Sequence, residues 1–188
     1  MTVARGLTGM AGEGRGTGLI LAALRFAAWK HRDQRRKGPG SVPYVNHPIE
    51  LANVLWFEGR VRDPVTIAAA ILHDTIEDTE TTADELRGAF GAAVAEVVQE
   101  VTDVTWLRKQ ARKKLQVARA AGSSRRARLI KLADKICNLR DIKAHPPRDW
   151  SIERRREYFD WARSVVDEIR GTNARLERKF DDVYRLKP

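Results

Sequence analysis

The feature that most constrains this chain is a run of apolar residues that leads directly into a cluster of charged ones. Residues 67–72 read Ile-Ala-Ala-Ala-Ile-Leu, so a helix formed there is apolar on all sides and has to be buried. Residues 73–78 read His-Asp-Thr-Ile-Glu-Asp, which places one histidine and three carboxylates within about one and a half helical turns. The sequence therefore predicts a central helix that ends in an acidic cluster.

Signals that start and stop helices recur along the whole chain. Prolines at 48 and 64 suit the first turn of a helix, and Asp63 is a suitable N-cap for the second of these. Later helices have suitable N-caps in Thr82, which fits a capping box with Glu85, in Ser123 or Ser124, and in Ser151. The period-two alternation of β-branched residues that is typical of strands is nowhere sustained. The expected helices cover about residues 17–33, 46 onward, 63 into the acidic cluster, 82–90, 92–103, 106–120, 124 onward, 151 onward and 172 onward. We therefore expect an all-α fold, a bundle of about eight to ten helices around the central one.

Composition indicates one domain. A chain of 188 residues with 43% hydrophobic content can bury a sizeable core, and no apolar run approaches the ~20 residues of a membrane span. Residues 1–18 are glycine-rich and lack the apolar segment of a secretory signal, so we predict a flexible lead before a domain at 19–188. Cys137 has no second cysteine to pair with, and both observations favour a cytoplasmic setting.

The chain is strongly basic, with a formal net charge of +10. A positive field attracts nucleic acid or a polyanionic small molecule, and charge alone does not choose between them. Many of the basic residues fall in helices such as 108–119, where a solvated helix face is the simpler interpretation. The charge therefore indicates an anionic partner without identifying it.

The acidic cluster is electrostatically costly in a continuous helix. His73 and Glu77 would lie one turn apart on one stripe, with Asp74 and Asp78 one turn apart on the next. The three carboxylates would fall near the helix C-terminus, where the macrodipole already disfavours negative charge. A divalent cation would remove both the repulsion and the conflict with the dipole, whereas a solvated helix end is the alternative interpretation.

Two further residues favour the metal interpretation. His47 stands at the start of a helix, and Asp134 lies inside the apolar run 129–139. Either one alone is more simply explained as a cap or an ion-pair partner. Together with His73 and Asp74 they form a ligand set suited to a borderline metal such as Mn²⁺, Fe²⁺ or Zn²⁺. We therefore predict a metal site built from these four residues.

The order His47, His73-Asp74, Asp134 resembles the H…HD…D pattern of the HD superfamily of metal-dependent phosphohydrolases. The surrounding sequence is similar to the stand-alone small alarmone hydrolases, the Mesh-type proteins, and to the hydrolase half of the long Rel/Spo enzymes. The resemblance extends over about residues 19–176, and the segments that carry it are 35–37, 43–48, 72–79, 101–103, 131–140 and 157–159. It implies an HD-domain helical bundle around a metal-binding helix.

The resemblance also implies an activity, the removal of pyrophosphate from the ribose 3′ position of guanosine tetra- or pentaphosphate to give GDP or GTP. Mn²⁺ is the usual metal of the family, and other divalent transition metals are compatible with the ligands. The implied metal ligands are His47, His73, Asp74 and Asp134. The implied catalytic pair, which handles water and protons, is Glu77 and Asp78. The implied substrate-binding residues are Arg36, Lys37, Asn138, Lys109 and Tyr158.

Other aromatic and basic residues are assigned no role in the site. His31 and His145 lack metal-like neighbours in the sequence and are interpreted as structural or surface residues. The five tryptophans are scattered over separate helices and are interpreted as packing residues. The segment 38–40, Gly-Pro-Gly, departs from the more polar family pattern and predicts a loop of different stiffness.

Two other functions compete with alarmone hydrolysis. Relatives with the same metal chemistry act on NADPH or on other nucleotides, and the sequence leaves these substrates open. A non-catalytic nucleic-acid binder would use the positive surface, but the intact set of ligand-type residues argues against it. The expected partner is the guanine nucleotide substrate. Neither a membrane nor nucleic acid is required, and a homo-oligomer is compatible with the sequence.

Overall fold

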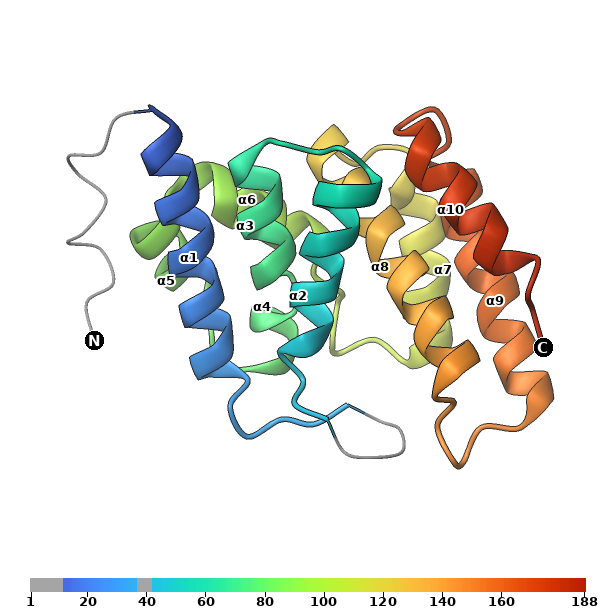
Figure 1. The fold of residues 1–188 in the computed structure, drawn as a ribbon. Helices are drawn as coiled ribbons and strands as arrows, with labels where there is room; N and C mark the ends of the chain where they lie inside the picture. The colour runs from blue at the N-terminus through green and yellow to red at the C-terminus, as the bar shows by residue number, and fades with distance from the viewer. Residues whose placement is uncertain (1–11, 37–41) are drawn as a thin grey trace.

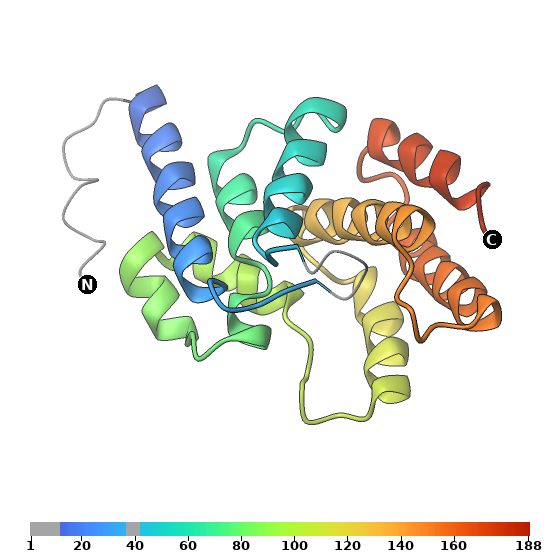
Figure 2. The same ribbon diagram turned by 60° about the horizontal axis from the view of Figure 1, so that its bottom comes forward.

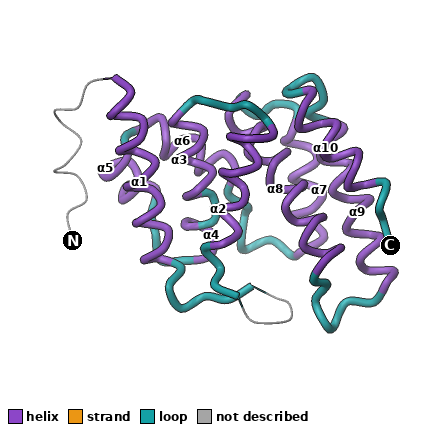
Figure 3. The backbone as a smooth tube through the Cα atoms, in the orientation of Figure 1, coloured by secondary structure: helices purple, strands orange, loops and turns teal. Residues whose placement is uncertain are grey.

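The computed structural model describes residues 12–36 and 42–188 of the chain. Those residues form ten α-helices and one π-helical segment, and their only extended pairing is an isolated bridge between Arg35 and Pro43. Figure 3 shows helices joined by loops, which confirms the predicted all-α fold. The elements are α1 (Gly12–Lys30), α2 (Asn46–Asn53), η2 (Val54–Glu58), α3 (Pro64–Leu72), α4 (Thr75–Asp78), α5 (Ala83–Phe90), α6 (Ala92–Val101), α7 (Lys109–Ala120), α8 (Arg125–Ala144), α9 (Ile152–Asp167) and α10 (Ala174–Tyr184).

The bundle extends from α1 at one end to α9 and α10 at the other (Figure 1). In its middle, α3 packs against α1, α2, α6 and α8. The second view shows α8 between α2 on one side and α9 and α10 on the other (Figure 2). Among the described helices, none has the combined length and hydrophobicity needed to span a bilayer. Segments that are distant in sequence therefore meet where α2, α3 and α8 come together.

α3 is the buried central helix that the sequence predicts, because residues 66–72 are all buried. Its first residue is fixed by Asp63, whose carboxylate accepts hydrogen bonds from the backbone N–H of Val65 at 3.4 Å and of Thr66 at 3.3 Å. Pro64 fills the first turn, as expected for a residue without an N–H to satisfy. Burial of apolar surface stabilises such a helix by roughly 25 cal/mol per Å², which places it in the interior of the bundle.

The first helix begins earlier than predicted, at Gly12. Residues 12–18, which we predicted to be part of a flexible lead, are therefore helical, while residues 1–11 of that lead lie outside the described residues. Gly16 gives a physical reason: a Cβ there would lie 3.3 Å from the Cβ of Pro64, so glycine permits close approach to the first turn of α3. Packing of α1 on the core outweighs the low helix propensity of its glycines.

Besides Asp63, the predicted N-caps are present at three further helices. The side-chain oxygens of Thr82, Ser124 and Ser151 each accept a hydrogen bond from the backbone N–H three residues on, at 3.1, 3.2 and 3.2 Å. The Glu85 carboxylate accepts a hydrogen bond from the Lys30 ammonium at 2.9 Å instead of completing a capping box. This ion pair links α5 to the end of α1.

Two local features differ from the sequence predictions. α2 continues into the π-helical segment η2, where the N–H of Gly59 donates to the carbonyl of Val54 at 2.9 Å. Glycine is needed there, since a Cβ would lie 2.9 Å from the carbonyl oxygen of Leu55, and the next residue, Arg60, has a positive φ of 55°. α7 begins at Lys109 rather than at 106, because residues 104–107 close a turn of their own.

We predict that Glu58 stabilises the fold through an ion pair that joins η2 to α8. Its carboxylate accepts hydrogen bonds from both terminal nitrogens of Arg140, at 2.6 and 2.9 Å, and this pairing lowers the pKa of Glu58. Glu58→Gln is expected to reduce the free energy of unfolding at pH 7 by about 1–2 kcal/mol. Because the pKa of Glu58 is lower in the folded state, the ion pair contributes its full stabilisation above the unfolded-state pKa of about 4.3. That contribution is lost as the pH falls through the folded-state pKa of Glu58.

Urea denaturation at pH 7 and near pH 3 checks this prediction. The difference between wild type and Glu58→Gln should shrink at the lower pH, while a control variant, Glu96→Gln, removes an exposed carboxylate from α6 and should behave as wild type at both. A difference that persists undiminished near pH 3 would contradict the ion-pair explanation.

Candidate metal centre and substrate cleft

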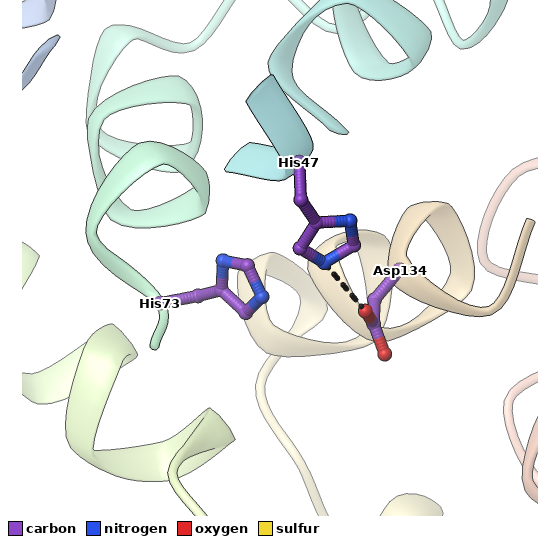
Figure 4. A group of neighbouring side chains, drawn as sticks. All are labelled: His47, His73 and Asp134. Carbon is purple, nitrogen blue, oxygen red and sulfur yellow. Dashed lines mark ion pairs between the residues drawn. The ribbon is translucent and has the colours of Figure 1, made fainter. Parts of the chain in front are cut away.

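Three helices bring a histidine pair and a carboxylate together in the middle of the bundle. His47 lies in the first turn of α2, His73 caps the C-terminus of α3, and Asp134 lies within α8. One ligand atom from each lies within 4.8 Å of the other two. Figure 4 shows the two imidazole rings and the carboxylate converging from their separate helices, with His47 Nε2 3.3 Å from Asp134 Oδ1. Three of the four predicted ligands therefore form one cluster.

The ring of His73 is held in one orientation. Its Nδ1–H donates a hydrogen bond to the backbone carbonyl of Ala70 at 2.8 Å, one turn earlier in α3. Its Nε2 then faces the cluster and lies 2.9 Å from Oδ2 of Asp74, the fourth predicted ligand. A histidine that ligates a metal ordinarily fixes its other nitrogen to such an acceptor. The backbone of α3 therefore orients His73 for ligation through Nε2.

The central helix does not continue through the acidic cluster, and this corrects the sequence prediction. α3 ends at Leu72, whose carbonyl accepts a hydrogen bond from the Thr75 hydroxyl at 2.6 Å. Asp74 has φ −97° and ψ 0°, in the sparsely populated bridge region between helix and strand. A new short helix, α4, then starts at Thr75 and carries Glu77 and Asp78 in its first turn. The two carboxylates thus avoid the C-terminal end of the α3 dipole.

Asp74 is held at this break by a residue that was not among the predicted site residues. The Tyr44 hydroxyl donates a short hydrogen bond to Asp74 Oδ2. Burial, and then the charge of Asp74, raise the pKa of Tyr44, so this hydroxyl stays a donor. Burial opposes ionisation of Asp74, but the charge of His73 outweighs it and lowers the pKa of Asp74. Tyr44 lies just before His47 in the segment 43–48, and its proximity in sequence was the available signal.

Asp134 is surrounded by donors. Its Oδ1 accepts a hydrogen bond from the Asn138 amide at 2.6 Å, and its Oδ2 accepts one from the Lys135 ammonium at 3.0 Å. The Lys135 side chain is buried and lies 4.4 Å from the ring centroid of Trp161. Burial works against the charge of Asp134, but Lys135 and then His47 lower the pKa of this carboxyl well below its usual range. Asp134 is therefore a largely buried anion that lines the inner chamber.

The cluster fits a divalent transition metal. Its donor set consists of two imidazole nitrogens and carboxylate oxygens, which is the set that borderline metals prefer. Burial disfavours a charged His73, yet the charge of Asp74 raises the pKa of this imidazole to about 9. The interior therefore attracts positive charge at this point, which a metal ion would supply in exchange for a proton.

The cluster opens into a cleft made of two chambers. The inner chamber, about 230 Å³, contains the four predicted metal ligands and Glu77. The outer chamber, about 460 Å³, lies towards the surface and is lined by Asp78. Both chambers are lined by the same four residues, Arg36, Tyr44, Asn138 and Tyr158. The predicted metal ligands and most of the predicted substrate-binding residues therefore line two adjoining chambers.

The two predicted catalytic carboxylates face different chambers. Glu77 Oε2 accepts a hydrogen bond from the backbone N–H of Asp103 at 3.2 Å, and its Oε1 from Arg112 at 3.4 Å. Burial, and then the charge of Asp103, raise the pKa of Glu77 to about 7. Asp78 is exposed at the outer chamber, and desolvation together with the charge of Asp74 raises its pKa. The structure thus separates a half-buried acid from an exposed one.

Three of the predicted substrate-binding residues, Arg36, Asn138 and Tyr158, line both chambers. Arg36 donates a hydrogen bond to Asn138 Oδ1 at 3.3 Å, forms a short ion pair with Asp141, and lies 5.8 Å from the ring centroid of Tyr44. Tyr158 is half-buried, and burial is the main cause that raises its pKa to about 12. Lys109 is more peripheral, and Lys37 falls outside the described residues.

Two tryptophans line the cleft, which corrects their interpretation as packing residues alone. Trp150 lines the outer chamber, where the Lys109 ammonium lies 5.6 Å from its ring centroid. Trp161 lines the inner chamber and follows Tyr158 by one helical turn of α9, a spacing that could have identified it. His145, interpreted as structural or surface, also lines the outer chamber. The cleft wall is therefore more aromatic than predicted.

The site and fold define a class of protein. Residues 23–160 match the family model described as HD domain, and this range contains all four predicted metal ligands. The chain belongs to the HD domain family.

Comparison with individual proteins narrows the relationship. The chain is 50% identical over 168 residues to the guanosine-3′,5′-bis(diphosphate) 3′-pyrophosphohydrolase MESH1 of Drosophila melanogaster, a match that covers 89% of this chain and 94% of that protein. It is 49% identical over 168 residues to MESH1 of Homo sapiens, with the same coverage. A solved structure described as a metazoan ortholog of SpoT that hydrolyses ppGpp matches with a TM-score of 0.87 and 49% identity, covering 89% of this chain and 94% of that one. The chain groups with the MESH1-type members of the HD domain family.

We predict that Lys135 offsets the interior charge of Asp134. Lys135→Met keeps an apolar stem against Trp161 but removes the ammonium, so the protein stripped of metal by a chelator should lose about 3 kcal/mol of stability. Adding Mn²⁺ should raise the melting temperature of this variant more than that of wild type, because the ion restores positive charge beside the carboxylate.

Thermal melts with chelator and with Mn²⁺ test this prediction against Lys143→Met, which removes an exposed lysine from the last turn of the same helix. Equal melting temperatures for the two variants in chelator would show that Lys135 does not offset the charge of Asp134.

Proposed function

We propose that this chain removes the 3′-pyrophosphate of guanosine tetra- or pentaphosphate, producing GDP or GTP and pyrophosphate. The observation that carries the proposal is one cleft with a His/Asp cluster at its inner end and cationic and aromatic side chains at its outer end. Such a space suits a nucleotide whose phosphates reach the inner chamber while its base stays outside. The MESH1 proteins of Drosophila melanogaster and Homo sapiens carry this activity in their names.

We assign His47, His73, Asp74 and Asp134 as the residues that hold a divalent ion, with Mn²⁺ as the proposed metal. When bound, such an ion neutralises charge on phosphorus oxygens and lowers the pKa of water into the neutral range. Support for this assignment comes from the convergence of three of these side chains and from the contact between Asp74 and His73.

Glu77 is the residue we assign to proton transfer. A carboxyl whose pKa is about 7 takes up and returns a proton at neutral pH with little cost, which is the condition that general base catalysis requires. The hydrogen bonds from Asp103 and Arg112 fix its two oxygens, so the carboxylate can orient water in the inner chamber. Asp78 is assigned the second proton-handling role, at the outer chamber.

The remaining cleft residues are assigned to nucleotide binding. The Arg36 guanidinium is planar, so it can stack on a base while it donates hydrogen bonds, and Asn138 and Asp141 already restrict its position. Asn138 and Tyr158 line both chambers, which supports their assignment to contacts with the ribose or base. Lys109 is assigned to contacts with the phosphates or base at the edge of the cleft. Lys37 is assigned to substrate binding, as the family resemblance implies.

We also propose the setting in which this activity takes place. The proposed domain includes all of α1 from Gly12 and so begins before the predicted range 19–188. The enzyme acts in the cytoplasm, and its partner is the guanine nucleotide. Neither a membrane nor nucleic acid is needed, and a homo-oligomer is compatible with the proposal. The buried, unpaired Cys137 supports the cytoplasmic assignment.

The substrate is tested by comparing turnover of guanosine tetraphosphate, NADPH and dGTP with Mn²⁺ under identical conditions. We expect pyrophosphate release from guanosine tetraphosphate to be the fastest reaction. Appreciable turnover of NADPH or dGTP with none of guanosine tetraphosphate would reject the proposed substrate and retain the metal-dependent hydrolase. Duplex binding without any metal-dependent hydrolysis would instead favour a nucleic-acid binder.

Two variants separate metal binding from proton transfer. Asp74→Asn is expected to abolish bound metal and activity together, because it removes a negative charge from the ion site. Glu77→Gln is expected to retain the metal and lose turnover by a factor of about 10²–10⁴. Metal content by elemental analysis and pyrophosphate release are measured on both, with Glu80→Gln, an exposed acid nearby, as the control. Near-normal turnover by Glu77→Gln would remove Glu77 from the mechanism.

A further inference from the structure

A second concave site lies at the N-terminal ends of the two helices that carry His73 and Asp134. Asp63, at the start of α3, and Arg125, at the start of α8, both line a pocket of about 540 Å³. With a helical rise of 1.5 Å per residue, the pocket lies roughly 14 Å along each helix from the metal cluster. It has no lining residue in common with the two chambers of the cleft.

The pocket wall is strongly cationic. Four arginines line it, against the single carboxylate of Asp63. Arg126 Nε donates a hydrogen bond to Oδ2 of that carboxylate at 2.7 Å, and the Arg62 guanidinium lies 4.1 Å from the ring centroid of Trp56. Within the part of the chain that the structure describes, no hydrogen bond or ion pair engages the guanidinium groups of Arg60 and Arg125. Cations are thus gathered at a hollow with too little negative charge to balance them.

The end of η2 sets the position of Arg60. Arg60 has φ 55°, and among the described residues it is the only one other than glycine with a positive φ. This is the left-handed residue of a helix C-terminal cap, in which the N–H of Val61 donates to the carbonyl of Leu55 at 2.9 Å. The turn is also fixed by the Asn173 amide, which donates a hydrogen bond to the carbonyl of Gly59 at 2.9 Å. The helix end therefore places the backbone of Arg60 at the pocket.

The available donors are guanidinium groups rather than the helix terminus. At the start of α8 the backbone N–H of Ser124 donates a short hydrogen bond to Glu100, and that of Ala127 donates to the Ser124 hydroxyl. An arginine fork matches the geometry of two phosphate oxygens, and the lining residues include no aromatic ring on which a base could stack. The volume lies in the range of small-molecule sites.

We propose that this pocket, the arginine pocket, binds a small phosphate-rich anion, an oligophosphate or a phosphorylated metabolite, independently of the catalytic cleft. Arg60 and Arg125 make the direct contacts, and Arg62 and Arg126 supply the surrounding positive charge. This binding site goes beyond the proposed hydrolysis. It uses none of the cleft residues, so the binding proposal can be tested independently of the proposed activity.

Calorimetric titration of the full chain with tripolyphosphate tests the proposal. The double variant Arg60→Gln/Arg125→Gln should lose one bound tripolyphosphate per chain or bind it at least about tenfold more weakly. A control double variant, Lys114→Gln/Arg178→Gln, removes the same charge from exposed positions on α7 and α10 and should titrate as wild type. Unchanged stoichiometry and affinity in the pocket variant would overturn the proposal, as would an equal loss in the control.

A measurement on the wild-type chain covers the case in which the double variant fails to fold. Phenylglyoxal modifies accessible arginines, and mass spectrometry locates the modified residues. Tripolyphosphate should slow modification of Arg60 and Arg125 but not of Arg178. Equal modification of Arg60 and Arg125 with and without tripolyphosphate would overturn the proposal. Protection of Arg60 and Arg125 by duplex DNA but not by tripolyphosphate would also overturn it, because the arginines would then belong to a surface that binds a macromolecule.

Discussion

The interior carboxylate of Asp134 is the constraint on which the rest of this structure depends. An ionised group in the protein interior is tolerated only when oppositely charged or hydrogen-bonding partners surround it. The partners of Asp134 are His47, which lies in α2, and Lys135 and Asn138, which lie in α8 with Asp134. Trp161 of α9 covers the buried lysine. The need to compensate one charge thus helps to fix α2 and α9 against α8.

The same electrostatic logic explains why the central helix breaks. A continuous helix through residues 73–78 would have set several carboxylates at the negative end of its dipole. The Thr75 hydroxyl closes α3 instead, and the following acids enter a new turn in which Glu77 and Asp78 turn towards different chambers. The break therefore distributes charge between the metal cluster, the inner chamber and the solvent-facing chamber.

Local sequence patterns predicted what depends on neighbouring residues. The burial of α3 follows from an unbroken apolar run, and the caps at Thr82 and Ser151 follow from residue type and position. The convergence of His47, His73 and Asp134 was predicted because charged or ligating groups in apolar settings need one another. Tyr44 and Trp161 were missed as site residues. Each lies close in sequence to a predicted site residue, but its contacts depend on which helices become neighbours. The π-helical turn at η2 likewise follows from tertiary packing, including the close approach of Leu176 to Gly59.

The order in which the proposed metal ligands occur along the chain has a consequence for biosynthesis. A ribosome delivers both imidazoles, His47 and His73, well before it delivers the carboxylate of Asp134. A nascent chain that stops short of α8 can therefore contain the complete acidic cluster and still lack the ligand set. An ion held by the proposed ligands would be captured with full affinity only after α8 has docked, and an ion that binds only the finished fold would stabilise it against reopening. Metal capture would thus act as a checkpoint that follows completion of the bundle.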